Sequence, residues 1–140
     1  MKVLLSIKPE FVHKISSGKK LYEYRKAIYS KRDIKRILIY STKPVGMIVG
    51  EFYVDDIIEE HPDKIWEKTK EYSGIKKSFY DNYFKGRQKG YAIKIGEKNF
   101  YEKPINPYEL FDSFTPPQSF LYLSNKKYSA SSILSEKLAV

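Results

Sequence analysis

Hydrophobic positions in the first part of the chain fall into short runs and alternations that predict β-strands. Residues 3–7 form a short apolar run, residues 21–26 alternate between apolar and polar, and residues 34–40 are rich in β-branched and aromatic side chains. Between the first two strands, Pro9 opens a segment with helical spacing, and Gly18 follows it as a helix-ending residue. The pattern therefore predicts a strand, a helix and two further strands.

The next segment predicts one long strand followed by two helices. Residues 45–58 are long enough for a bent strand, with Gly46 and Gly50 as bend or bulge points. The first helix opens at His61, and the second stops at Gly86. The second helix carries an aromatic stripe at helical spacing, which indicates packing in the core: Phe79, Tyr80, Tyr83 and Phe84.

The last part of the chain predicts short strands again. Residues 91–95 and 100–103 are interpreted as two strands joined by a turn at 96–99, a brief helix begins at Asn106-Pro107, and residues 120–123 form a final strand. About six or seven strands, with most helices gathered into one insertion, favour an α+β barrel over alternating βαβ units. We expect one domain over residues 1–124 and a Ser-rich C-terminal tail over 125–140 that forms a short helix or frays.

Composition narrows the class of protein. The 140 residues include no cysteine, so a disulfide framework and a thiolate metal site are both excluded. The apolar stretch at the N-terminus is too short for a signal peptide or a membrane span, so we expect a soluble cytoplasmic protein with no membrane partner. The formal net charge is +9. Acidic residues are concentrated in residues 51–75, and a basic region lies on each side of this segment. A folded chain with that distribution can present a positive face to phosphates, although a well-solvated lysine-rich surface explains it equally simply.

Candidate chemistry is concentrated in residues 18–25, which read Gly-Lys-Lys-Leu-Tyr-Glu-Tyr-Arg. On a strand, Glu23 and Arg25 project from the same face, and Lys20 stands at the strand's entry. In a cleft, the two cations can bind an oxyanion while the carboxylate accepts hydrogen bonds from a base. Alternatively, burial and Arg25 lower the pKa of Lys20 while Glu23 opposes that change. A plain exposed edge strand is the structural alternative.

This segment resembles the ASCH family, whose pattern G-x-K-x-x-E-x-R follows the first helix of the domain. Gly18, Lys20, Glu23 and Arg25 fill all four fixed positions, and the similarity in strand order extends over residues 3–123. The resemblance implies a PUA-like mixed β-barrel with a helical insertion and flanking helices, and a cleft lined by the motif. It also implies a role in RNA binding, RNA processing or regulation; ribonuclease activity is also attributed to the family.

One branch of that family is similar to an amidohydrolase that removes the acetyl group from N4-acetylcytidine with a lysine, a threonine and a glutamate. Lys20 matches the lysine, and Glu71 is the match for the glutamate, but Glu23 stands where that branch has threonine. An acyl-enzyme at residue 23 is therefore unavailable. A carboxylate there can instead activate water as a general base, with Lys20 stabilising the oxyanion.

Four further residues are candidates for ligand binding. Ser41 and Thr42 stand in a loop that would border the cleft, Tyr91 would flank it, and the Gln118 amide can form two hydrogen bonds with a base edge. Each also has a structural explanation in turn capping, packing or strand initiation. The two histidines are isolated in sequence and there is no nucleotide-binding fingerprint, so no metal or cofactor is expected.

Three functions remain open from sequence. The first is a binding module that takes RNA or a modified nucleoside through Lys20, Glu23, Arg25 and the four residues above. The second is a hydrolase, either an amidohydrolase or a ribonuclease, that uses Lys20, Glu23 and Glu71. The third is a protein-interaction module that keeps the barrel without a ligand.

Overall fold

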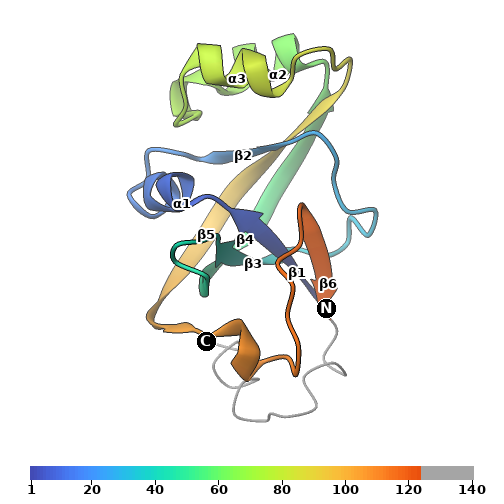
Figure 1. Ribbon diagram of the computed structural model, residues 1–140. Helices are drawn as coiled ribbons and strands as arrows, with labels where there is room; N and C mark the ends of the chain where they lie inside the picture. Colours follow the sequence, from blue (N-terminus) through green and yellow to red (C-terminus); the bar gives the residue numbers. More distant parts are fainter. Residues whose placement is uncertain (124–140) are drawn as a thin grey trace.

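A mixed six-stranded sheet curls into a half-barrel, and its two longest strands, β4 (Met47–Glu60) and β5 (Gly90–Ile105), run antiparallel through the length of the molecule (Figure 1). The computed structural model describes residues 1–123. The other strands are β1 (Lys2–Ile7), β2 (Tyr22–Arg25), β3 (Arg36–Ser41) and β6 (Phe120–Leu123). The helices are α1 (Pro9–Ser16), α2 (Pro62–Thr69) and α3 (Lys77–Tyr83), with 3-10 turns η1 (Lys70–Tyr72) and η2 (Pro107–Glu109).

The strand order across the sheet is β2-β5-β4-β3-β1-β6. Among the strands of residues 1–123, only the pairing of β1 with β3 is parallel, and α1 and β2 lie in the connection between these two strands. The other pairings are antiparallel. The expected α+β fold, a curled PUA-like sheet with a helical insertion and flanking helices, is confirmed.

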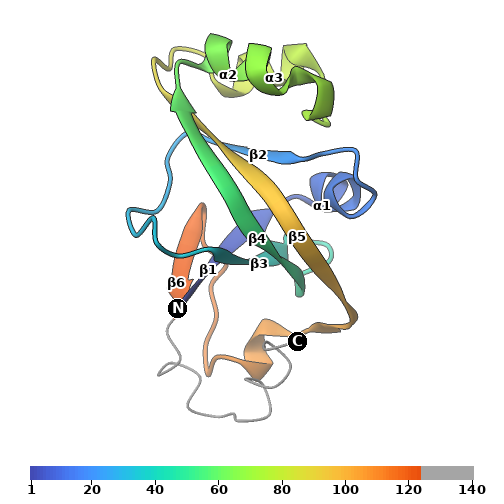
Figure 2. The same ribbon diagram turned by 180° about the vertical axis from the view of Figure 1, so that it is seen from behind.

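The insertion of α2, η1 and α3 joins the far ends of β4 and β5, which extend beyond β3, β1 and β6 (Figure 2). The predicted start at His61 is confirmed, because the His61 side chain accepts a hydrogen bond from the Asp63 backbone as the cap of α2. In both views the insertion stands over β2, with α1 beneath that strand. The strand β2 therefore runs between the insertion and α1.

The turn predicted at residues 96–99 is wrong, because β5 is one continuous strand. Lys98 and Asn99 pair with Phe52 and Glu51 of β4, and register shifts along the ladder absorb the irregularity. Gly96 fits a close approach of strands rather than a turn, since a Cβ there would lie 2.9 Å from the backbone carbonyl oxygen of Tyr53 on β4.

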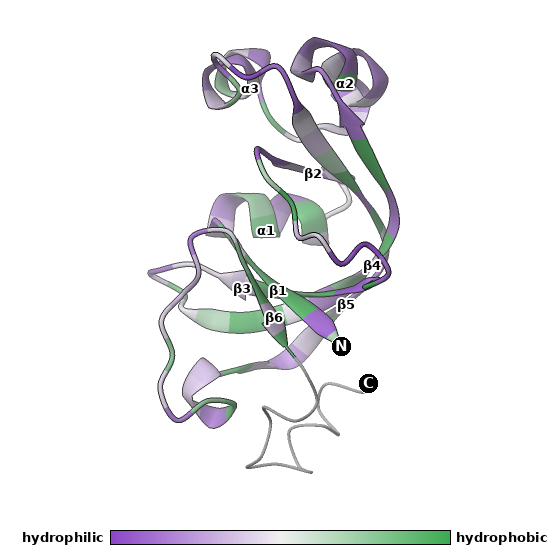
Figure 3. Cartoon of the chain, turned by 90° about the vertical axis from the view of Figure 1, so that its right-hand side faces the viewer, coloured by the Kyte–Doolittle hydropathy of each residue, from purple (hydrophilic) through white to green (hydrophobic). Residues whose placement is uncertain are grey.

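Apolar side chains concentrate on β1 and β3, whereas the insertion helices carry mostly polar residues (Figure 3). The aromatic stripe on α3 divides. Tyr80 and Phe84 are buried in a cluster with Tyr24, as expected, but Phe79 is 41% exposed and Tyr83 is only partly buried. The stripe is therefore only half core, and the other half faces a cavity described below.

The C-terminal tail and the length of the helices bear on two further expectations. The C-terminal tail, residues 125–140, lies outside the described residues. Within residues 1–123, no helix is both long enough and apolar enough to cross a membrane.

Candidate functional site

A cavity of about 410 Å³ opens between the barrel and the helical insertion. The strand β2 forms its floor, α1 and the β1–α1 junction form one wall, and α3 forms the facing wall. The described residues that line it are Ser6, Ile7, Lys8, Phe11, Lys20, Glu23, Tyr24, Arg25, Thr42, Ile75, Phe79, Tyr83, Pro117 and Gln118.

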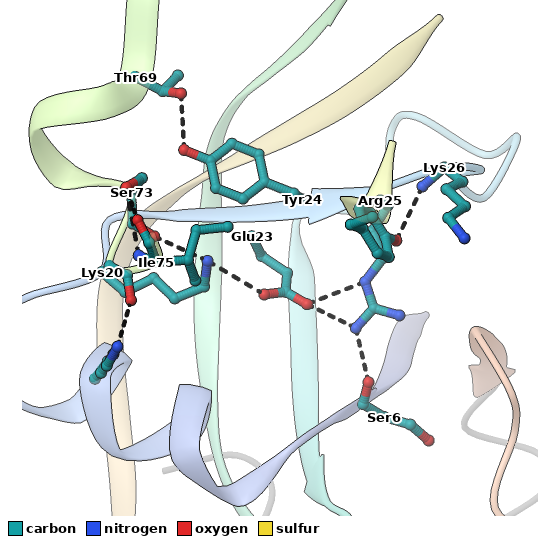
Figure 4. A network of polar contacts seen from close by, with 12 residues as sticks. Ser6, Lys20, Glu23, Tyr24, Arg25, Lys26, Thr69, Ser73 and Ile75 are labelled. Carbon is teal, nitrogen blue, oxygen red and sulfur yellow. Dashed lines mark hydrogen bonds and ion pairs between the residues drawn. The ribbon is translucent and has the colours of Figure 1, made fainter. Parts of the chain in front are cut away.

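Lys20 is the most unusual residue of this cavity because a lysine is rarely buried. Its side chain is 2% exposed, and its Nζ donates a hydrogen bond to the Ser73 carbonyl oxygen at 3.1 Å (Figure 4). The Nζ also lies 3.9 Å from Glu23 Oε1 and 4.6 Å from the centre of the Tyr24 ring. Burial lowers the pKa of Lys20 from 10.5 to about 8; Glu23 raises it, and Lys14 and Arg25 add to the lowering.

The burial of Lys20 depends on a close approach of the segment after η1. Gly74 has a φ of +70°, and a Cβ at that position would lie 2.6 Å from Lys20 Cβ. The Lys14 ammonium donates to the Gly74 carbonyl oxygen at 2.7 Å, which ties α1 to the same segment. At the other side, Gly18 has a φ of +81° just after α1, so the chain turns and brings Lys20 under the insertion. The predicted helix end at Gly18 is confirmed.

Glu23 and Arg25 project together, as their spacing on the strand predicts. Arg25 donates to Glu23 Oε2 from Nη2 at 2.8 Å and from Nε at 3.1 Å. The same guanidinium donates to the Ser6 carbonyl oxygen at 2.7 Å and to the Ser119 carbonyl oxygen at 3.4 Å. Most of its donors are therefore engaged within the protein, and its main effect is to fix Glu23 with Oε1 directed to Lys20 (Figure 4).

The structure brings together five of the eight predicted site residues. Those that line the cavity are Lys20, Glu23, Arg25, Thr42 and Gln118.

The other three predicted residues lie elsewhere among the described residues. Ser41 is buried in the β3–β4 ladder opposite Met47. Tyr91 lies on β5 beneath the guanidinium of Arg32, 5.5 Å from it. Glu71 is exposed on η1 and does not line the cavity, because the chain turns inward only after it, at Ser73.

Sequence reasoning missed the aromatic walls of the cavity. Phe11 comes from α1, and Phe79 and Tyr83 come from α3. Phe11 and Phe79 meet at the cavity in an edge-to-face arrangement, with ring centres 5.4 Å apart. The helical spacing of 79 and 83 placed them on one face, but only the position of α3 over β2 shows that this face lines a cavity.

Titratable side chains other than those of the motif are sparse here. Within residues 1–123 no group of three or more histidine, aspartate or glutamate side chains is placed to hold a metal ion. The charged groups at the floor of the cavity are Lys20, Glu23 and Arg25, and aromatic side chains form its walls.

Comparison with known proteins agrees with the motif. A family profile described as the ASCH domain matches residues 5–104. A Zymomonas mobilis protein named "ASCH domain-containing ribonuclease" is 30% identical over 130 residues, which cover 89% of this chain and 85% of that protein. A large ribosomal subunit protein uL22 from Ureaplasma parvum is 31% identical over 90 residues, which cover 64% of this chain but only 29% of that protein.

The fold is similar as well. The crystal structure of the ASCH protein from Zymomonas mobilis superposes with a TM-score of 0.82 at 28% identity, and the match covers 99% of this chain and 93% of that chain.

Proposed function

This chain belongs to the ASCH domain family, and we propose that it is a ribonuclease that cleaves RNA in the cavity above β2. The observation that carries the proposal is the buried Lys20, whose Nζ lies 3.9 Å from Glu23 Oε1 in a cavity open to solvent. A buried, paired cation beside a carboxylate in a cavity is a common arrangement at catalytic sites. The Zymomonas mobilis ribonuclease, similar over most of both chains, supports RNA as the substrate.

That similarity favours the hydrolase over a module that only binds RNA. Within the hydrolases, the observations favour a ribonuclease over an amidohydrolase. The glutamate that an amidohydrolase would need, Glu71, is exposed and does not line the cavity, and residue 23 is a carboxylate rather than a hydroxyl. The acyl-enzyme route is therefore absent, and a general-base route through Glu23 would lack the second carboxylate in the cavity.

The roles of the three residues follow from their chemistry. Glu23 Oε1 takes the proton from a ribose 2′-hydroxyl, and the 2′-oxygen attacks the adjacent phosphorus. The new 2′-oxygen–phosphorus bond forms as the bond from phosphorus to the 5′-oxygen breaks. Lys20 stabilises the charge on the phosphoryl group and gives its proton to the leaving 5′-oxygen. The products are a 2′,3′-cyclic phosphate and a 5′-hydroxyl.

The lowered pKa of Lys20 suits this role. With a pKa of about 8, Lys20 is mostly protonated at neutral pH yet gives up its proton more readily than an ordinary lysine. Arg25 keeps Glu23 in place through two hydrogen bonds, so it acts as a positioning residue.

The test is cleavage of an RNA oligonucleotide by the wild type, Lys20→Ala and Lys19→Ala. Lys19 is the matched control because it is the exposed neighbour of the buried Lys20. We expect Lys20→Ala to lose at least 100-fold in rate, in line with the usual contribution of acid–base catalysis of roughly 10²–10⁴, and Lys19→Ala to cleave as the wild type does. Mass spectrometry should show the 2′,3′-cyclic phosphate.

Two results would refute the proposal. If the wild type binds RNA without cleaving it, the chain is a binding module. If Lys20→Ala cleaves at the wild-type rate, the activity does not reside in this cavity.

A further inference from the structure

The two aromatic residues on the α3 wall of the cavity each carry a lysine from the opposite side. Lys8, at the β1–α1 junction, places its Nζ 5.9 Å from the centre of the Phe79 ring. Lys26, directly after β2, places its Nζ 4.7 Å from the centre of the Tyr83 ring, and its backbone N–H donates to the Tyr83 hydroxyl at 3.2 Å. The barrel thus sends one cation to each end of the aromatic wall.

The two pairs lie one helical turn apart. Phe79 and Tyr83 are four residues apart on α3, so their side chains lie on one face, separated by about 6 Å along the axis. Both rings line the cavity. The wall is therefore a short aromatic platform with one lysine ammonium near each ring, and Lys20 and Glu23 lie on the floor beside it.

Neither lysine is neutralised by the protein. Among the described residues, neither Lys8 nor Lys26 forms an ion pair with a carboxylate, and both are exposed. Other exposed lysines do have such partners; Lys77 pairs with Asp81 at 2.8 Å, for example. Two uncompensated cations at the ends of an aromatic platform suit a base with a phosphate on each side.

We propose that Lys8 and Lys26 are two phosphate subsites that hold the backbone on either side of a base stacked on Phe79 and Tyr83. The proposal rests on the proposed function and narrows its substrate class. The substrate is an RNA strand that continues in both directions from the bound nucleotide. Cleavage is therefore internal rather than confined to a chain end.

The test is equilibrium binding, which does not depend on cleavage. The ligands are a pentanucleotide with 2′-fluoro sugars, which lacks the attacking hydroxyl, and the corresponding free nucleoside. Binding by isothermal titration calorimetry is measured at several salt concentrations for the wild type, Lys8→Ala, Lys26→Ala and Lys26→Arg. Lys103→Ala is the control, because Lys103 is an exposed lysine of β5 that neither lines the cavity nor lies over a ring of the aromatic wall.

We expect each alanine variant to reduce the slope of log affinity against log salt by about 0.7 for the pentanucleotide, which is the loss of one phosphate contact on a single strand. Lys26→Arg and Lys103→Ala should keep the wild-type slope, and nucleoside affinity should be unchanged in every variant. Replacing the platform residue, Phe79→Ala, should weaken both ligands by roughly 5- to 150-fold, the usual effect of losing one stacking contact.

Two outcomes would overturn the subsites alone. If Lys8→Ala and Lys26→Ala weaken the nucleoside as much as the pentanucleotide, the lysines only support the aromatic rings. If neither changes the salt slope, the phosphates run elsewhere, even when cleavage still depends on Lys20. A wild type that binds no pentanucleotide and cleaves no RNA would overturn this proposal and the proposed function together.

Discussion

Glu23→Gln is the substitution that tests the electrostatics of the site most directly. It removes one negative charge 3.9 Å from Lys20 Nζ and keeps the shape of the side chain and an oxygen that can accept from Arg25. Coulomb's law gives about 4 kcal/mol for this pair at an effective dielectric constant of about 20, and about 1 kcal/mol in water. Because 1.36 kcal/mol corresponds to one pH unit, the pKa of Lys20 should fall by about one to three pH units from its value of about 8.

The assay is an NMR titration of the lysine side chains in the wild type and Glu23→Gln. The Lys20 resonance should titrate near pH 8 in the wild type and at clearly lower pH in the variant. An unchanged or raised midpoint for Lys20 in Glu23→Gln would refute the inferred contact between the two groups.

The same variant separates two roles for Glu23 in cleavage. If Glu23 accepts the proton of the 2′-hydroxyl, Glu23→Gln is inactive at every pH. If Glu23 only keeps Lys20 protonated, activity returns when the pH is lowered far enough to protonate Lys20 again. Recovery of RNA cleavage between about pH 5 and 6 would therefore rule out Glu23 as the base.

Three predictions concern stability, each measured by urea unfolding at pH 7. Lys20→Met should raise the free energy of unfolding by about 1 to 3 kcal/mol. The pKa of Lys20 is lowered from 10.5 to about 8, so keeping this lysine charged in the folded state costs about 3 kcal/mol of stability, fully present below pH 8 and absent above pH 10.5. A variant less stable than the wild type would contradict this. Gly74→Ala should lower the free energy of unfolding by about 1 to 3 kcal/mol because its Cβ would strike Lys20. The control is Gly86→Ala, whose φ is +79° and whose Cβ would meet nothing within 4 Å, so it should show backbone strain alone. Equal losses in the two variants would refute the close approach of Gly74 to Lys20. Tyr24→Phe should lose about 1 kcal/mol, since its hydroxyl donates to Thr69 at 2.7 Å in a buried pair; an unchanged midpoint would mean that the bond adds nothing.

The strands and helices could be predicted because their patterns are local. The alternation over residues 21–26 and the glycine at 18 predicted β2 and the end of α1, and both are found. The turn at 96–99 was wrong because Gly96 is also what a close crossing of two strands requires, and the local sequence does not separate these two uses of glycine.

The candidate site divides in the same way. The Glu23–Arg25 pair was predictable because two residues on one strand meet whatever the rest of the fold does. Glu71 lies outside the cavity although it is only two residues before Ser73, and only the tertiary path shows that the chain turns into the cavity after Glu71.

The helical insertion has a physical role that follows from these contacts. Lys20 has its low pKa chiefly because it is buried, and the cover that buries it on one side is the segment after η1. Ser73 supplies the carbonyl that accepts from its ammonium, and Gly74 lies against its Cβ. A barrel without this segment would leave the same lysine hydrated, with an ordinary pKa. The insertion therefore does more than add an aromatic wall: it converts a surface lysine of the motif into a group whose proton can be exchanged near neutral pH.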